Sequence, residues 1–190
     1  VARQPQSVVL TTQTAVAATH LHALQCQPPQ GRVVVADTQN QRIVIYEADG
    51  TFSQVLLGEG ELATPTDVAV SVNESSIWIA NLGANNIMEL SLDDTVIRTH
   101  GEKGSAPGKF RQVRSIAQGP DGTLYATDRE LNRIQLLDPL LGDPLLVYGE
   151  YGSGPGQFDS VSGIALTWTG TVVIADPLNK RIQFADISNS

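Results

Sequence analysis

The sequence predicts an all-β fold made of a sheet unit that occurs four times. Three observations support this prediction: a segment that repeats along the chain, runs of β-branched residues within each copy, and turn-forming residues between the runs. The first copy of the segment reads VVVADTQNQRIVIY, and the four copies begin 44 to 48 residues apart, at Val33, Ile77, Leu124 and Val172. Repetition at this period is typical of blade and solenoid architectures.

Each copy holds two apolar runs separated by a short polar loop. Runs such as residues 33–35 are β-branched and bounded by turn residues, which favours a strand with both faces covered. A carboxylate or amide ends the first run, and an arginine or asparagine stands five positions later, directly before an isoleucine. These pairs are Asp37 and Arg42, Asn81 and Asn86, Asp128 and Arg133, and Asp176 and Arg181. The charged pairs predict a salt bridge across the loop, which stabilises an exposed turn by about 0–1 kcal/mol.

Two further apolar segments complete each unit, one before and one after the repeated segment. Four short antiparallel strands at this spacing predict one blade of a β-propeller. The predicted blades cover residues 19–58, 64–101, 111–149 and 159–186.

The two ends of the chain are predicted to complement each other. The fourth unit stops after its third strand, whereas residues 7–14 form an additional strand before the first unit. In the simplest arrangement this N-terminal strand completes the last blade and closes a four-bladed ring. The alternative is that the four units are part of a larger propeller with about six blades.

Glycine-rich linkers separate the units, and the last two follow the pattern GxxGxxPGxF. The pattern comprises Gly101, Gly104, Pro107, Gly108 and Phe110, and then Gly149, Gly152, Pro155, Gly156 and Phe158. With the GIA segment at 163–165 and the AD…N.RIQ segment at 175–183, these linkers make residues 21–185 similar to the NHL-repeat family of β-propellers. The first linker departs from the pattern, because Leu62 replaces the phenylalanine. The resemblance implies a propeller that acts as an interaction module within a larger protein.

Composition narrows the range of partners. The formal net charge is −8 and the sequence pI is about 4.7, which argues against a phosphate backbone and therefore against nucleic acid as the partner. No apolar run approaches the roughly 18 residues of a membrane span. The single cysteine, Cys26, has no second cysteine with which to form an internal disulfide.

Histidines and aspartates offer the main candidates for a metal site. His20 and His22 stand two apart, so on a strand both rings point to one side. This spacing can ligate zinc or copper, with His100 or an aspartate of another blade as a third ligand. Asp37, Asp128 and Asp176 could form a ring of carboxylates for calcium, but their repetition at one position favours a turn-forming role. We expect no cofactor, with zinc or calcium as the alternative.

Residues near the start of each innermost strand vary while the strand cores repeat. These positions predict a binding site at the mouth of the central channel, formed by His22, Thr66, Asp67, Arg114 and Ser162, with drift in exposed loops as the alternative. Of the two tryptophans, Trp78 is expected in the core and Trp168 in an exposed turn.

Two functions follow from these observations. The first is a non-enzymatic binding or scaffold module, a monomeric domain of a larger protein, that recognises a protein or small ligand across one propeller face. The second is a metal-dependent lyase or hydrolase with its site at the channel mouth. Lyases resembling this propeller class use histidines from several blades, whereas this chain has three histidines in all.

Overall fold

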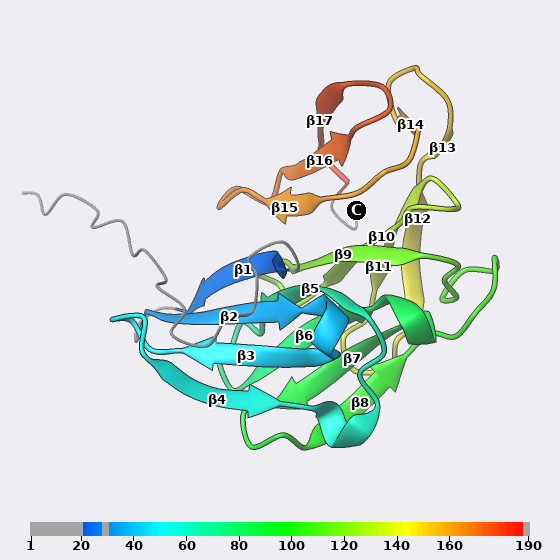
Figure 1. The fold of residues 1–190 in the computed structure, drawn as a ribbon. Helices are drawn as coiled ribbons and strands as arrows, with labels where there is room; N and C mark the ends of the chain where they lie inside the picture. The colour runs from blue at the N-terminus through cyan, green and yellow to red at the C-terminus, as the bar shows by residue number, and fades with distance from the viewer. Residues whose placement is uncertain (1–20, 28–30, 188–190) are drawn as a thin grey trace, which may run out of the picture.

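The structure, a computed structural model, describes residues 21–27 and 31–187, which fold into a series of small, mostly antiparallel sheets (Figure 1). Helical structure in these residues is limited to three 3-10 turns, η2 (Thr38–Asn40), η3 (Gly58–Gly60) and η4 (Leu82–Ala84). The strands are β1 (Leu21–Gln27), β2 (Arg32–Asp37), β3 (Arg42–Tyr46), β4 (Phe52–Leu56), β5 (Pro65–Val70), β6 (Ser76–Asn81), β7 (Asn86–Ser91), β8 (Val96–His100), β9 (Val113–Gln118), β10 (Leu124–Asp128), β11 (Arg133–Leu137), β12 (Pro144–Tyr148), β13 (Glu150–Tyr151), β14 (Gln157–Phe158), β15 (Ile164–Leu166), β16 (Val172–Asp176) and β17 (Arg181–Ala185).

Each repeat unit forms one sheet whose strands lie in chain order. Blade 1 is β1–β4, blade 2 is β5–β8, blade 3 is β9–β12, and blade 4 is the three-stranded sheet β15–β17. The inner strands lie side by side from blade to blade, β1 beside β5, β5 beside β9, and β9 beside β15 (Figure 1). This arrangement confirms the predicted all-β propeller blades. Residues 7–14 lie outside the described residues, so closure of blade 4 by an N-terminal strand stays a prediction.

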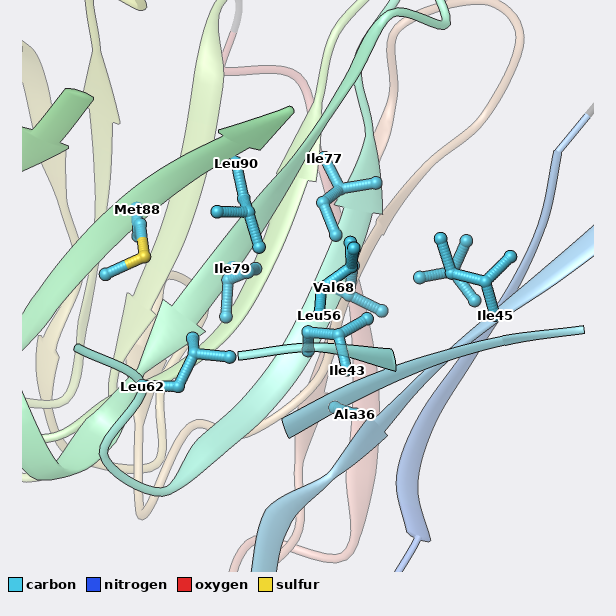
Figure 2. Packing of buried hydrophobic residues seen from close by; sticks show 11 residues of the cluster. Ala36, Ile43, Ile45, Leu56, Leu62, Val68, Ile77, Ile79, Met88 and Leu90 are labelled. Atoms are coloured by element: carbon cyan, nitrogen blue, oxygen red, sulfur yellow. The ribbon is translucent and has the colours of Figure 1, made fainter. Parts of the chain in front are cut away.

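The hydrophobic core lies between blades rather than within them. Side chains of β2 and β3 such as Ile43 and Ile45 pack against Ile79 and Met88 of blade 2, and Figure 2 shows this cluster. Successive strand residues point to opposite faces, so blade 2 also presents a second apolar face to blade 3, and blade 3 one to blade 4. Each interior blade is therefore apolar on both faces, which explains the continuous apolar runs in the sequence.

The loop between the second and third strands has the same backbone shape in every blade. The residue directly before the third strand is left-handed each time, with φ between 51° and 55°, at Gln41, Asn85, Asn132 and Lys180. A left-handed residue is uncommon outside glycine and costs about 1–2 kcal/mol when it has a β-carbon. The four copies therefore share one turn geometry even though the residue differs.

The carboxylate that ends the second strand of a blade binds the linker leading into that blade. Asp128 accepts hydrogen bonds from the backbone N–H groups of Arg111 and Gln112, at 2.9 and 3.0 Å, and Asp176 accepts one from Asp159 at 2.8 Å. Both aspartates are fully buried. The repeated aspartate is thus a latch that fixes the linker just before the inner strand begins.

The arginine and glutamine that follow complete this latch. The Arg133 guanidinium donates to the carbonyl oxygens of Ser105, Ala106 and Lys109 at 2.9–3.0 Å, and Gln135 donates to the Lys109 carbonyl oxygen at 2.8 Å. In blade 4, the equivalent contacts join Arg181 to Ser153, Gly154 and Gln157, and Gln183 to Gln157. The predicted salt bridge forms at Asp37–Arg42 (2.7 Å) and Asp176–Arg181 (2.8 Å). For Asp128 and Arg133 no such bridge forms among the described residues, although both side chains bind the linker backbone as Asp176 and Arg181 do.

The phenylalanine of each linker anchors it in the core. Phe110 and Phe158 are fully buried between blades, and Leu62 takes this place in the first linker. A β-carbon on Gly149 (φ +95°) would lie 2.3 Å from the Phe158 ring, and one on Gly101 (φ +85°) would lie 2.7 Å from Phe110. The first glycine of the GxxGxxPGxF pattern is therefore required by its last residue.

Candidate functional site: the channel mouth

The predicted mouth residues occupy equivalent β-bulges at the start of the inner strands. The pairing of inner and second strands shifts register at His22 in β1, at Thr66 in β5, and at Arg114 and Ser115 in β9. Ser162 comes just before β15, and its N–H donates to the Ala175 carbonyl oxygen. Bulges re-aim side chains and occur next to functional sites, so this end of the inner strands is where side chains can differ between blades.

Two of these bulges are joined by hydroxyl groups that reach across to the next blade. The Thr66 hydroxyl donates to the Arg114 carbonyl oxygen at 2.9 Å, and Thr127 donates to the Ser162 carbonyl oxygen at 2.7 Å. Thr66 and Thr127 are both buried. Thr66 therefore joins blade 2 to blade 3, which accounts for its hydrogen-bonding capacity without a ligand.

Asp67 also joins two blades through hydrogen bonds, and its pKa is shifted from the usual value. Its carboxylate accepts hydrogen bonds from the Ser115 hydroxyl and from the backbone N–H groups of Val68 and Ile116, at 2.9 and 3.0 Å. Burial raises the pKa of Asp67, and the Ser115 hydroxyl, these N–H groups and the nearby Arg114 charge oppose that rise only in part. Ser115 in turn accepts from the Ile164 N–H at 3.2 Å, so one short network joins blades 2, 3 and 4.

Among the described mouth residues, Arg114 is the charged one whose side chain is not hydrogen-bonded to the scaffold. Its side chain is half-buried, and within the described part of the chain its guanidinium has no hydrogen-bond or ion-pair partner. Burial lowers the pKa of Arg114, the positive charge of Arg129 lowers it further, and the negative charge of Asp67 opposes this shift only in part, so the two guanidinium groups lie close enough to interact. Arg129 is exposed and donates to the Ser160 hydroxyl at 2.6 Å. The mouth thus holds two neighbouring cations in a chain whose net charge is −8.

A cavity of about 330 Å³ lies along the inner strands β5, β9 and β15 next to this mouth. Its lining is formed by Asp67, Val68, Val70, Ile116, Ala117, Gln118, Ile164, Ala165 and Leu166. Most of these residues are aliphatic, but polar atoms make up the larger part of the surface that faces the cavity. The site can therefore hold a group with both polar and apolar atoms in the cavity and an anionic group near Arg114.

The histidines that the sequence predicts as metal ligands do not come together in the described part of the chain. His20 lies outside the described residues, and His22 is described only as backbone in β1. His100 lies on the outer strand β8, where its ring stacks on Trp78 at 5.8 Å and its Nε2 is 3.0 Å from the Pro139 carbonyl oxygen. It therefore packs between blades and not at the mouth. In residues 21–27 and 31–187, no group of three or more histidine, cysteine, aspartate or glutamate side chains could hold a metal ion.

The tryptophans lie where the sequence predicts. Trp78 is buried between blades 2 and 3, and Trp168 is 94% exposed in the turn between β15 and β16, at the opposite end of the inner strands from the mouth. None of the described helices is long and apolar enough to cross a membrane.

Sequence reasoning places Ser115 at the mouth as the residue after Arg114, but it missed two other residues there, Thr127 and Arg129. Ser115 and Thr127 are equivalent to Asp67 and Ala80, and only the register of strand pairing brings them together. Arg129 follows the repeated aspartate, at the position where blades 1 and 4 have Thr38 and Pro177. A comparison of this position across the four copies would have identified Arg129 as the exception.

Comparison with known proteins supports the repeat and the architecture. No protein-family model matches the chain. The chain is 27% identical over 109 residues to NHL repeat-containing protein 3 from Homo sapiens, which covers 52% of this chain and 31% of that protein. The chain thus spans under a third of the length of this curated relative.

Solved structures with the same fold include several enzymes. A catalytically inactive virginiamycin B lyase from Staphylococcus aureus with quinupristin matches with a TM-score of 0.68 and 18% identity, over 90% of this chain and 54% of that one. A streptogramin B lyase matches with a TM-score of 0.69 and 17% identity, over 90% and 52%. Hydrazine synthase from Kuenenia stuttgartiensis matches with a TM-score of 0.68 and 14% identity, over 95% and 49%. At these identities the likeness shows the fold alone, and the chain spans about half of each structure.

Three findings agree: the glycine-rich linker pattern, the blades whose inner strands lie side by side, and the similarity to a protein named for its NHL repeats. The chain is built of β-propeller blades and is similar in sequence to an NHL repeat-containing protein.

Proposed function

We propose that this chain is a non-enzymatic binding module that recognises a segment of a partner protein at the channel mouth. Arg114 is the observation that carries the proposal, because it is the charged mouth residue whose side chain makes no hydrogen bond or ion pair within the described part of the chain. Two neighbouring guanidinium groups repel each other, and the nearby Asp67 carboxylate, which already accepts three hydrogen bonds, offsets this repulsion only in part. A mouth of this kind favours a ligand with a carboxylate.

The cavity suggests what accompanies that carboxylate. Its lining residues on β9 and β15 are largely aliphatic, polar atoms form most of its exposed surface, and its volume of about 330 Å³ suits one or two side chains of an extended peptide. An acidic residue next to an apolar residue in an extended peptide would place its carboxylate at Arg114 and Arg129 and its apolar side chain in the cavity. Arginine suits this role because its planar fork binds carboxylates through two parallel hydrogen bonds.

Several residues that the sequence predicts as ligand contacts instead hold the blades together. Thr66 and Asp67 hold blade 3 in place, and Ser162 receives the hydroxyl of Thr127 through its carbonyl oxygen. They shape the mouth and leave Arg114 as the specific contact. The similarity to an NHL repeat-containing protein is consistent with a module of this type.

A peptide selection tests the proposal without a known partner. A phage library of random peptides is panned on the chain, and the strongest binders are synthesised and measured by fluorescence polarisation. We expect the enriched peptides to combine Asp or Glu with a neighbouring apolar residue, and Arg114→Gln to weaken their binding by about tenfold or more.

The control variant removes the same charge elsewhere. Lys103 is exposed on the linker into blade 3, so Lys103→Gln should leave the dissociation constant within about twofold. Peptides that bind Arg114→Gln as tightly as the unaltered chain, or a selection without acidic enrichment, would rule out this site.

A further inference from the structure

The turn between β5 and β6 departs from the equivalent turn of the next blade. Residues 71–76 join these strands in blade 2, whereas a shorter segment, residues 119–123, joins β9 to β10 in blade 3. The left-handed residue of the turn is Gly122 in blade 3, with φ 90°, but Glu74 in blade 2, with φ 57°. Blade 2 therefore has a glutamate where glycine would adopt the conformation more easily, and an additional residue, Ser75, follows it.

This turn contains the sequence Asn73-Glu74-Ser75, which is the acceptor pattern for an N-linked glycan. Asn73 and Ser75 are both exposed, and the Ser75 hydroxyl donates to the Asn73 carboxamide oxygen at 2.8 Å. In blade 3 the hydroxyl residue that ends the turn, Thr123, is buried. The additional residue of blade 2 therefore brings both the asparagine and the hydroxyl group of the pattern to the surface.

The turn uses only the oxygen of the Asn73 carboxamide. This oxygen also accepts from the Ser71 hydroxyl at 2.7 Å and from the Ser75 N–H at 3.1 Å, whereas the Asn73 Nδ2 donates to no acceptor in the described part of the chain. In blade 3 an aspartate, Asp121, has the same role, and its oxygens accept from the N–H and the hydroxyl of Thr123. An aspartate would therefore suffice for the turn, and the fold does not explain why residue 73 carries an NH₂ group.

We propose that Asn73 is the attachment site of an N-linked glycan. The donor class is an oligosaccharide activated on a lipid diphosphate. Its anomeric carbon forms a bond with the Asn73 Nδ2, which loses one proton. The bond between that carbon and the diphosphate oxygen breaks, and the diphosphate leaves with the electron pair, so no oxidant or reductant is needed.

The attachment site lies at the opposite end of the inner strand from the channel mouth. β5 begins beside the mouth residues Thr66 and Asp67 and ends at Val70, shortly before Asn73. A glycan is bulky and hydrated, so it would cover the end of blade 2 at the β5–β6 turn and leave the mouth free. The modification is therefore independent of the peptide binding proposed for the mouth.

Mass spectrometry of the protein isolated from its own cells tests the proposal. We expect peptides that contain residue 73 to carry a glycan, and peptide-N-glycosidase to release it and leave an aspartate at this position. Expression of the chain behind a secretion signal in eukaryotic cells then allows variants to be compared. Ser75→Ala should abolish the modification, because it removes the hydroxyl group of the pattern, whereas Ser75→Thr should retain it.

Asn73→Asp separates the modification from folding. This variant loses the acceptor nitrogen but keeps the oxygens that the turn uses, as Asp121 does. It should carry no glycan, and its melting temperature should lie within about 2 °C of the unglycosylated chain produced in bacteria. An unmodified Asn73 in the natural protein would overturn the proposal, as would a glycan that persists in Asn73→Asp or in Ser75→Ala.

Discussion

Blades 3 and 4 hold their incoming linkers with three side chains, whereas blade 2 does so with one. In blade 4, Asp176, Arg181 and Gln183 all bind the linker, and blade 3 repeats this arrangement. Blade 2 has Asn81, Asn86 and Met88 at the same positions, and only Asn81 reaches the linker, accepting from the Ala63 N–H at 2.7 Å and donating to the Glu61 carbonyl oxygen at 3.0 Å.

The difference shows that the latch residues and the linker sequence change together. The linker into blade 2 contains η3 instead of the glycine-proline segment, and its core anchor is Leu62 instead of a phenylalanine. Met88 cannot hydrogen-bond a linker backbone as glutamine does, and it packs in the core between blades 1 and 2. The Asp–Arg–Gln pattern therefore serves the long glycine-rich linker, and it is dispensable where that linker is absent.

The largest effect that separates the two kinds of linker should come from the core anchor. Phe158→Ala removes a fully buried ring between blades 3 and 4, so we expect unfolding to become easier by about 3–5 kcal/mol. Phe158→Leu imitates blade 2 and should cost about 1–2 kcal/mol, because a leucine refills much of the space. Urea denaturation followed by tryptophan fluorescence measures both, and equal losses for the two variants would contradict a packing role.

The arginine of the latch should have the next largest effect. Arg133→Ala removes three hydrogen bonds from a charged donor to linker carbonyl oxygens, so we expect a loss of about 2–4 kcal/mol in the free energy of unfolding. The equivalent residue of blade 2 provides the control. Asn86→Ala removes an amide whose oxygen is buried and has no hydrogen-bond partner, so this change should lie within about 0.5 kcal/mol of the unaltered chain. Comparable losses at both positions would contradict the latch.

The strands and the mouth differ in how far sequence alone predicts them. Residues such as Val33 and Ile77 predict their strands because a repeated apolar run has few alternatives, and the equivalence of Thr66 and Arg114 follows from the repeat register. What these side chains contact does not follow. The partners of Asp67 and Arg133 are largely backbone groups of another blade or a linker, and backbone groups leave no signature in a sequence.

The exposure of the apolar side chains in blade 4 could not be predicted from the sequence either. Ile182 has the same neighbours along the chain as Ile134, namely an arginine before it and a glutamine after it. One is exposed and the other is buried, because the difference depends on whether a further sheet lies against the strand. Local patterns therefore predict which face of a strand is apolar, but not what covers that face.

Acid should weaken the latch of blade 4 but not that of blade 2. Burial raises the pKa of Asp176, but hydrogen bonds from the Asp159 N–H, Asn179 and Arg181 outweigh it, and the net pKa lies below the usual 3.8. A lowered pKa means that the stabilisation is complete above pH 3.8 and is lost as the pH falls through the lower, folded-state pKa. Asp176→Asn should therefore flatten the loss of stability below pH 3.8, measured by urea denaturation at successive pH values.

Asp67 provides a control, because its pKa is shifted in the opposite direction to that of Asp176. Its pKa is raised, so it favours folding most below pH 3.8 and loses that contribution as the pH rises through its folded-state value. Asp67→Asn should therefore flatten the pH dependence above pH 3.8 and leave the acid limb unchanged. If both variants altered the same limb, one of the two assignments would be wrong.

The smallest effect should come from the shared left-handed turn, where the blades differ only in the residue that adopts it. Gln41 has φ 52° and Asn85 has φ 55°, but asparagine tolerates this region and glutamine does not. Gln41→Gly should stabilise the chain by about 0.5 kcal/mol, because relief of about 1–2 kcal/mol of strain is partly offset by the extra freedom of glycine in the unfolded chain. Asn85→Gly should change the melting temperature less than Gln41→Gly does. A larger gain at Asn85 than at Gln41 would mean that the strain depends on the surroundings of the turn and not on the residue that occupies it.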